Sequence, residues 1–178
     1  MQPVSCSATS YDRMTIVLHW VVALLVVEQF LGAQIIDWFP RGPLRVNARS
    51  VHIVLGVTLA VLLAVRIFWR LTRGRQLVRE PGLLNLAARL VHHLLYVLLI
   101  AIVLLGLVLT SARGDSIFGA FSVWSFAPGN RDLANAIGEV HETVAWTIIV
   151  VAALHAAAAL FHRFVLKDRV LQRMWPRG

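Results

Sequence analysis

The sequence predicts an all-α fold, an integral membrane bundle of four helices, from its composition and from four long apolar stretches. Hydrophobic residues make up 58% of the 178 residues, whereas soluble domains have about 45–50%. Charged residues make up only 15%, against about 25% in soluble domains. Residues 1–178 are therefore expected to form one membrane domain.

Each apolar stretch is close to the length of about 20 residues that a helix needs to cross a bilayer. The first is too long for the apolar core of a signal peptide and is expected to be a retained helix. Proline and glycine separate the stretches, because these residues favour turns over helix interiors. The predicted helices cover about residues 15–36, 49–70, 87–111 and 138–165.

The basic residues are distributed unequally between the two sides of the predicted bundle. The side with both termini and the second connection has 12 Lys and Arg residues, and the other side has 5. Because cytoplasmic segments of membrane proteins are enriched in Lys and Arg, both termini are predicted to be cytoplasmic. This topology explains the net charge of +8 better than nucleic-acid binding does. The 12 are Arg13, Arg66, Arg70, Arg73, Arg75, Arg79, Arg89, Arg163, Lys167, Arg169, Arg173 and Arg177; the 5 are Arg41, Arg45, Arg49, Arg113 and Arg131.

Four of the seven histidines lie within the apolar segments at two matched depths. His52 and His141 lie near the outer ends of the second and fourth helices, and His19 lies near the cytoplasmic start of the first. His155 follows His141 by 14 residues, which is about 21 Å along a helix and close to four turns. Helix four would thus supply one histidine to each depth from nearly the same face.

Paired imidazoles inside a helical bundle are a means of holding haem iron. The pairs predicted are His52 with His141 and His19 with His155. The alternative is that these rings make hydrogen bonds between neighbouring helices. Since the only cysteine is Cys6, the sequence has no disulfide pair, and it has no CxxCH motif for covalent haem attachment.

Several short segments together resemble the bacterial cytochrome b561 family, and within it the short superoxide oxidase members. The resemblance runs from about residue 11 to the C-terminus, and its most specific parts are the His-Glu-Thr segment at residues 141–143 and the Leu-His-Ala-Ala-Ala-Ala-Leu segment at 154–160. Further support comes from Thr15 with His19 and Trp20, from residues 51–56, from Lys167 and Asp168, and from residues 171–176.

The resemblance implies a bacterial inner-membrane protein with two b-type haems, whose iron ligands correspond to His19, His52, His141 and His155. It also implies that superoxide is oxidised to molecular oxygen at the periplasmic face and that ubiquinone accepts the electrons. The competing function is an electron-transfer cytochrome b subunit between the quinone pool and a dehydrogenase or periplasmic redox protein. A membrane anchor without redox chemistry is the third alternative. No nucleic-acid partner and no obligate protein partner is evident.

Other residues are weaker candidates, and each has a plain structural alternative. Arg41, Arg45 and Arg49 lie in the predicted connection before His52, where they would steer superoxide, pair with haem propionates or keep the loop soluble. Arg66 and Arg70 are propionate partners or cytoplasmic anchors. His92, His93 and Arg89 are placed near a quinone or the inner haem, or at the membrane interface. Glu28 and Gln29 make local hydrogen bonds or support a ligand histidine, and His162 is expected to be interfacial.

Overall fold

The computed structural model describes residues 10–75, 82–168 and 170–175. Within them lie four long helices, α1 (Arg13–Ile36), α2 (Pro43–Thr72), α3 (Leu83–Arg113) and α4 (Arg131–Phe164). A two-stranded antiparallel hairpin, β1 (Ser116–Ile117) and β2 (Phe121–Ser122), lies between α3 and α4, and a 3-10 turn, η1 (Leu171–Met174), follows α4. All four helices are long and apolar enough to cross a membrane. The predicted all-α membrane four-helix bundle is confirmed.

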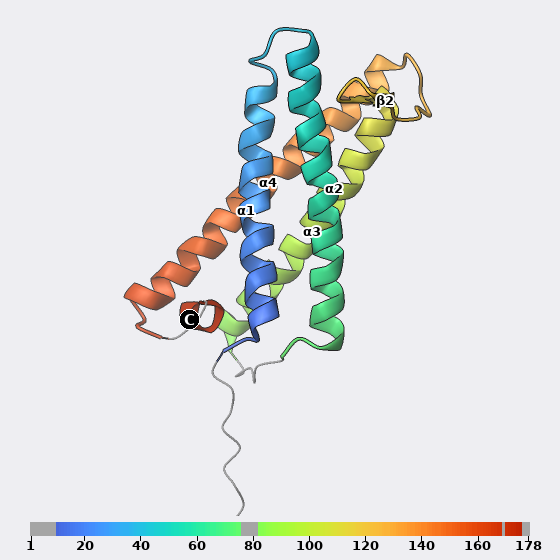
Figure 1. Cartoon of the computed structure of the whole chain (residues 1–178). Helices are drawn as coiled ribbons and strands as arrows, with labels where there is room; N and C mark the ends of the chain where they lie inside the picture. Colours follow the sequence, from blue (N-terminus) through green and yellow to red (C-terminus); the bar gives the residue numbers. More distant parts are fainter. Residues whose placement is uncertain (1–9, 76–81, 169, 176–178) are drawn as a thin grey trace, which may run out of the picture.

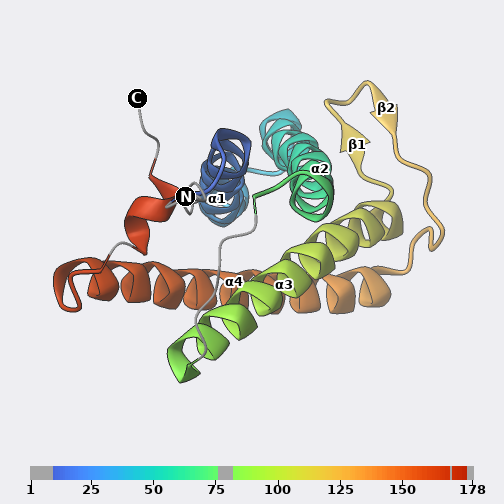
Figure 2. The same cartoon turned by 90° about the horizontal axis from the view of Figure 1, so that it is seen from below.

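The helices form two layers, with α1 and α2 in one and α3 and α4 crossing behind them in the other (Figures 1 and 2). The start of α1, the end of α2, the start of α3 and the end of α4 lie at one end, which we call the terminal end. The opposite end, which we call the hairpin end, holds residues 37–42 and the β-hairpin. Arg79, Arg169 and Arg177, counted above on the side of the termini, lie outside the described residues.

Local sequence signals set the helix ends. Asp12 caps α1 by accepting a hydrogen bond from the Thr15 N–H at 3.0 Å, and Asn130 caps α4 through Leu133 in the same way. Pro43 occupies the first turn of α2, where its missing N–H costs nothing. Gly114 ends α3 in the left-handed conformation at φ +64°, which favours glycine.

All four helices begin earlier than the hydropathy pattern predicted, and the difference is largest for α2 and α4. α2 begins at Pro43 rather than near residue 49, and α4 begins at Arg131 rather than near residue 138. The first turns of both helices contain Arg or Asn residues, which end an apolar window but do not end a helix. Apolar length therefore marks the membrane-crossing part, whereas the caps mark the helix.

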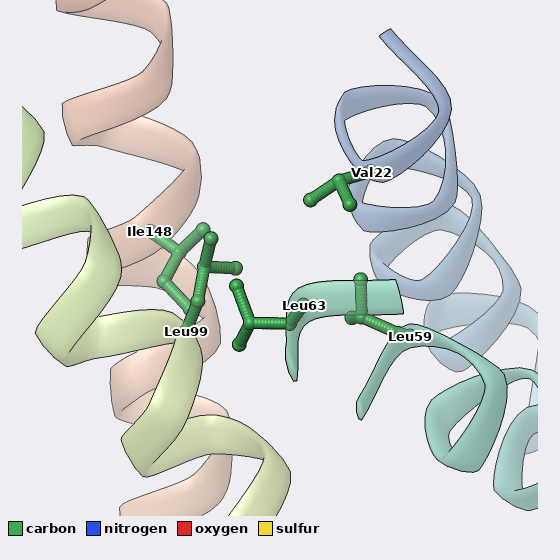
Figure 3. Close-up of a cluster of buried hydrophobic side chains, with 5 residues drawn as sticks. All are labelled: Val22, Leu59, Leu63, Leu99 and Ile148. Carbon is green, nitrogen blue, oxygen red and sulfur yellow. The ribbon is translucent and has the colours of Figure 1, made fainter. Parts of the chain in front are cut away.

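A small apolar core lies at the middle of the bundle. It contains one or two side chains from each helix, and few other side chains are buried. Most large apolar side chains instead face outwards, as expected for helices that contact lipid. The core residues are Val22, Leu59, Leu63, Leu99 and Ile148 (Figure 3).

Candidate functional site

A seven-residue ladder on each helix passes through this core, and the ladders together place polar residues on both sides of it. On α4 the ladder is His141, Ile148 and His155, and the outer two flank the buried isoleucine. Seven residues span about 10.5 Å and almost two full turns, so ladder residues share a face. The other ladders are Gln29 and Val22 on α1, His52, Leu59 and Arg66 on α2, and Gly106, Leu99 and His92 on α3. The bundle thus has two polar levels separated by one apolar level.

At the level nearer the hairpin end, His52 and His141 face each other across the bundle. Their ring centroids are 6.4 Å apart and their planes are inclined by 74°. Both rings line a cavity of about 580 Å³ that is bounded by all four helices. Gly106 lets the His141 ring lie against α3, because a Cβ at this position would be 3.3 Å from His141 Cε1.

This pair of histidines fits the geometry of a six-coordinate haem iron. Two imidazoles on opposite sides of one metal, each with a metal–nitrogen bond of about 2 Å, have ring centroids about 6 Å apart. In both rings the Nδ1 atom is buried and makes no hydrogen bond to any described residue. Two protein ligands suit a metal whose other ligands come from a porphyrin.

Gln29 of α1 supports the His52 region of α2. Its Nε2 donates to the His52 carbonyl oxygen at 3.0 Å. Gly56 lies four residues after His52, and a Cβ there would be 3.0 Å from the same Nε2. The glycine therefore leaves the space in which the amide reaches the carbonyl.

At the level nearer the terminal end, His19 and His155 each lie against a side chain from another helix. Arg66 Nη2 lies 3.0 Å from His19 Nδ1, and the rings of His155 and His92 are 5.0 Å apart. Because arginine only donates hydrogen bonds, Nδ1 of His19 accepts, and a neutral ring carries its proton on Nε2. Ligation of a metal by His19 Nε2 therefore requires loss of that proton or movement of Arg66.

The remaining candidates near the terminal end include His92 and His93 on α3 and Arg70 on α2. His92 hydrogen-bonds the Ala88 carbonyl through Nδ1 at 2.6 Å, which leaves Nε2 without the proton and near His155. His93, the next residue on α3, makes the corresponding hydrogen bond to the Arg89 carbonyl oxygen at 2.7 Å. The Arg70 guanidinium lies over the Tyr11 ring, 5.6 Å from its centroid.

The arginines expected in a connection before His52 lie mainly in α2, which corrects that placement. Arg41 is exposed in the connection, whereas Arg45 and Arg49 belong to the helix. Arg45 donates to the Asp37 and Phe39 carbonyl oxygens, each at 2.8 Å, and lies 3.4 Å from the Asp37 carboxylate. Arg49 pairs with Asp115 at 3.1 Å. Their charges are thus partly offset by protein carboxylates.

Arg113 is a site residue that the sequence reasoning missed. It ends α3, lines the cavity with His52 and His141, and has no carboxylate within 4 Å among the residues described. Its guanidinium lies against α4, where a Cβ on Gly138 would be 3.3 Å from Nη2. The sequence feature that could have indicated Arg113 is its spacing, since it follows Gly106 by seven residues and so lies on the ladder face of α3.

Two carboxylates outside the membrane-spanning helices, those of Asp12 and Asp168, make hydrogen bonds at the terminal end. Although burial alone raises it, the pKa of Asp12 lies well below its usual range because Thr15, Arg75 and Trp69 donate hydrogen bonds to the carboxylate. Burial likewise raises the pKa of Asp168, but the hydrogen bond with His162 and that from the Val170 N–H give a net lowering. Asp12 thereby joins the start of α1 to the end of α2.

Comparison with known proteins identifies the family. The family model described as prokaryotic cytochrome b561 matches residues 10–177, which is nearly the whole chain. The chain belongs to the prokaryotic cytochrome b561 family. As a member of this family, it is a membrane electron-transfer protein of the oxidoreductase type, and the family implies b-type haem.

Individual b561-type relatives align over almost their entire length. The chain is 33% identical to cytochrome b561 homolog 1 of Escherichia coli strain K12, with 94% of this chain and 97% of the relative covered. It is 31% identical to the probable superoxide oxidase CybB of Yersinia pestis, with coverage of 94% and 96%. It is also 32% identical to cytochrome b562 of Cereibacter sphaeroides, with coverage of 92% and 94%.

Proposed function

We propose that this cytochrome b561 protein is a superoxide oxidase, which oxidises superoxide to molecular oxygen and delivers the electrons to ubiquinone. The observation that carries the proposal is the His52–His141 pair, 6.4 Å apart across a cavity near the hairpin end. The specific substrate is supported by the relative from Yersinia pestis, whose name is probable superoxide oxidase.

Four histidines would hold two b-type haems, with His52 and His141 at the outer level and His19 and His155 at the inner level. Haem bound in this way supplies reversible one-electron exchange. The four histidines would hold the haem iron, and electron transfer from superoxide would not require superoxide to bind the metal. Val22, Leu59, Leu99 and Ile148 exclude water from the level between them.

The chemistry balances across the bundle. Two superoxide ions each give up one electron and leave as molecular oxygen, and one ubiquinone takes up these two electrons together with two protons from water to form ubiquinol. Arg113, with Arg41, Arg45 and Arg49, is proposed to give local positive charge for an anionic substrate, near a cavity that Asp37, Asp115, Glu139 and Glu142 also line. His92, His93 and Arg89 are proposed near the quinone, and Arg66 and Arg70 near haem propionates.

The proposed orientation places the terminal end in the cytoplasm and the hairpin end in the periplasm of a bacterial inner membrane. The count of 12 against 5 Lys and Arg residues supports it. The outer cavity would then open on the side where superoxide is consumed.

Haem reduction by superoxide in three histidine variants tests this function. We expect the purified protein to show a b-type optical spectrum, superoxide to reduce it, and ubiquinone to reoxidise it. His52→Ala should abolish electron entry, whereas His19→Ala should leave entry and block delivery to quinone. His162→Ala is the control, because His162 lies on α4 outside both levels and contacts Asp168.

Two results would contradict the proposal in different ways. If superoxide left the haems oxidised while a dehydrogenase or periplasmic redox protein reduced them, the chain would be an electron-transfer subunit. If the purified wild-type protein bound no haem, the redox function itself would be wrong.

A further inference from the structure

We propose that Gln29 is the positioning residue of the outer site, where its amide oxygen accepts the Nδ1–H of His52 while the other ring nitrogen binds the metal. The inference rests on the proposed haem ligation and names a residue that neither the family resemblance nor the comparisons assign.

Two complementary atoms without partners carry the inference. Gln29 Oε1 is a hydrogen-bond acceptor, and His52 Nδ1 can be a donor. Both are buried, and neither has a hydrogen-bond partner within the described part of the chain. Buried polar groups are almost always hydrogen-bonded in native proteins, so each of these atoms calls for a partner.

The two residues already contact each other and share one cavity. Gln29 Nε2 holds the His52 carbonyl at 3.0 Å, and both side chains line the cavity. The amide is therefore fixed beside His52 at its nitrogen, and its oxygen remains available. The second torsion of an imidazole is broad and soft, and the proposed hydrogen bond requires the ring to turn about it so that Nδ1 faces that oxygen.

Gly56 shows that the sequence keeps this space open. It lies on the same face of α2 as His52, one turn later, and any side chain there would meet the Gln29 amide. Gly56 on α2 thus provides the space that the Gln29 side chain from α1 occupies. The Nδ1 of His141 is also without a partner among the described residues. The surroundings differ, however, because the neighbouring glycine, Gly106, leaves space for the His141 ring itself rather than for an amide.

The chemical consequence is control of the ligand's electron donation. A metal-bound histidine usually donates its second N–H to an acceptor, which fixes the ring and raises its basicity. A more basic imidazole stabilises the oxidised metal and lowers the reduction potential. Removal of the acceptor should raise the potential, and a stronger acceptor should lower it.

Redox titration of haem-loaded Gln29 variants tests the proposal, because it measures an equilibrium rather than turnover. We expect Gln29→Leu to raise the midpoint potential of one haem, by about tenfold in the reduction equilibrium, or about 59 mV for a one-electron couple. Gln29→Glu keeps an acceptor and strengthens it, so this variant should shift the same haem in the opposite direction. Gln34→Leu is the matched control, since Gln34 is also on α1 and lines the cavity.

Opposite shifts would support a hydrogen bond to the ligand, because a purely structural disturbance has no reason to change sign between the two variants. Shifts of the same sign, or shifts no larger than that of Gln34→Leu, would overturn the role of Gln29. In that case an intact wild-type b-type spectrum would leave the proposed function standing. Absence of haem from the wild-type protein would overturn both.

Discussion

Single side chains at the terminal end hold α1, α2 and the segment after α4 together. The Asp12 carboxylate accepts from the Thr15 N–H, the Trp69 indole and the Arg75 N–H. The indole of Trp20 donates a hydrogen bond to the Met174 carbonyl at 2.9 Å. The backbone N–H of Tyr11 donates one to the Arg173 carbonyl at 3.1 Å. The helix cap is thus also a tertiary contact, since the same carboxylate caps the start of α1 and accepts a hydrogen bond from Trp69 of α2.

The pKa of Asp12 predicts how stability depends on pH. Because the folded protein holds this pKa below its unfolded value, the stabilising contribution is present above about pH 4 and is lost as the pH falls through the folded pKa. Asp12→Ala should cost about 0.5–2 kcal/mol at pH 7 through loss of the cap. Thermal unfolding in detergent across this pH range measures the effect.

Asp12→Asn separates the charge from the cap, because asparagine caps helices about as well as aspartate. Its deficit relative to wild type should therefore be smaller than that of Asp12→Ala at pH 7 and should shrink in acid. A deficit that stayed constant down to the lowest pH would contradict a role for the Asp12 charge.

Residue types alone identified the candidate ligands but not their partners. His19, His52, His141 and His155 are visible because ionisable rings are rare in apolar segments. The contacts of His19 with Arg66 and of His155 with His92 were not visible, because they depend on how α1, α2, α3 and α4 are rotated about their axes. Arg113 was missed for the same reason.

Among the elements, the β-hairpin is fixed to α2 by two neighbouring residues just before His52. Arg49 pairs with Asp115, and Ser50 is fully buried. The Ser50 hydroxyl accepts from the Phe118 N–H at 2.8 Å and lies 2.7 Å from the Val46 carbonyl. Phe118 has φ +51°, an uncommon conformation for a bulky residue, and the serine holds it there.

Ser50→Ala should loosen this hairpin without unfolding the bundle. The substitution leaves the Phe118 N–H without an acceptor, which costs about 1–3 kcal/mol. Amide hydrogen exchange over residues 116–122 should become faster as a result. Thr58→Ala is the control, because within the described residues the Thr58 hydroxyl bonds the Val54 carbonyl of the same helix and no other group. An equal effect of both variants would argue against a specific role of Ser50 in holding the hairpin.

At the scale of the whole molecule, the apolar surface points outwards and the polar ladders point inwards. In the most apolar window of α3 only 6% of residues are buried inside the protein, so lipid must cover most of this surface. The ladder side chains of His52, Arg66, His141 and His155 are half-buried between the helices, whereas His92 is exposed near the terminal end. This arrangement lets one small bundle enclose charged and titratable groups at two depths.

The orientation of the bundle in the membrane can be measured directly. Fusion of a reporter that is active only in the cytoplasm should give activity after residue 178 and no activity when the reporter is fused after Gly129. The physical reason is the excess of Lys and Arg at the terminal end. The reverse pattern would invert the proposed positions of the superoxide and quinone sites.

The sequence by itself determined the fold class, the four spans and the histidines proposed as haem ligands, because apolar length and ionisable groups in apolar segments are local properties that the bilayer selects. Only the tertiary structure decided which side chains meet. It brought His52 and His141 to 6.4 Å across one cavity, placed Gln29 on the His52 carbonyl, and engaged His19 with Arg66. These contacts depend on helix rotation and crossing, which side-chain packing between distant segments fixes.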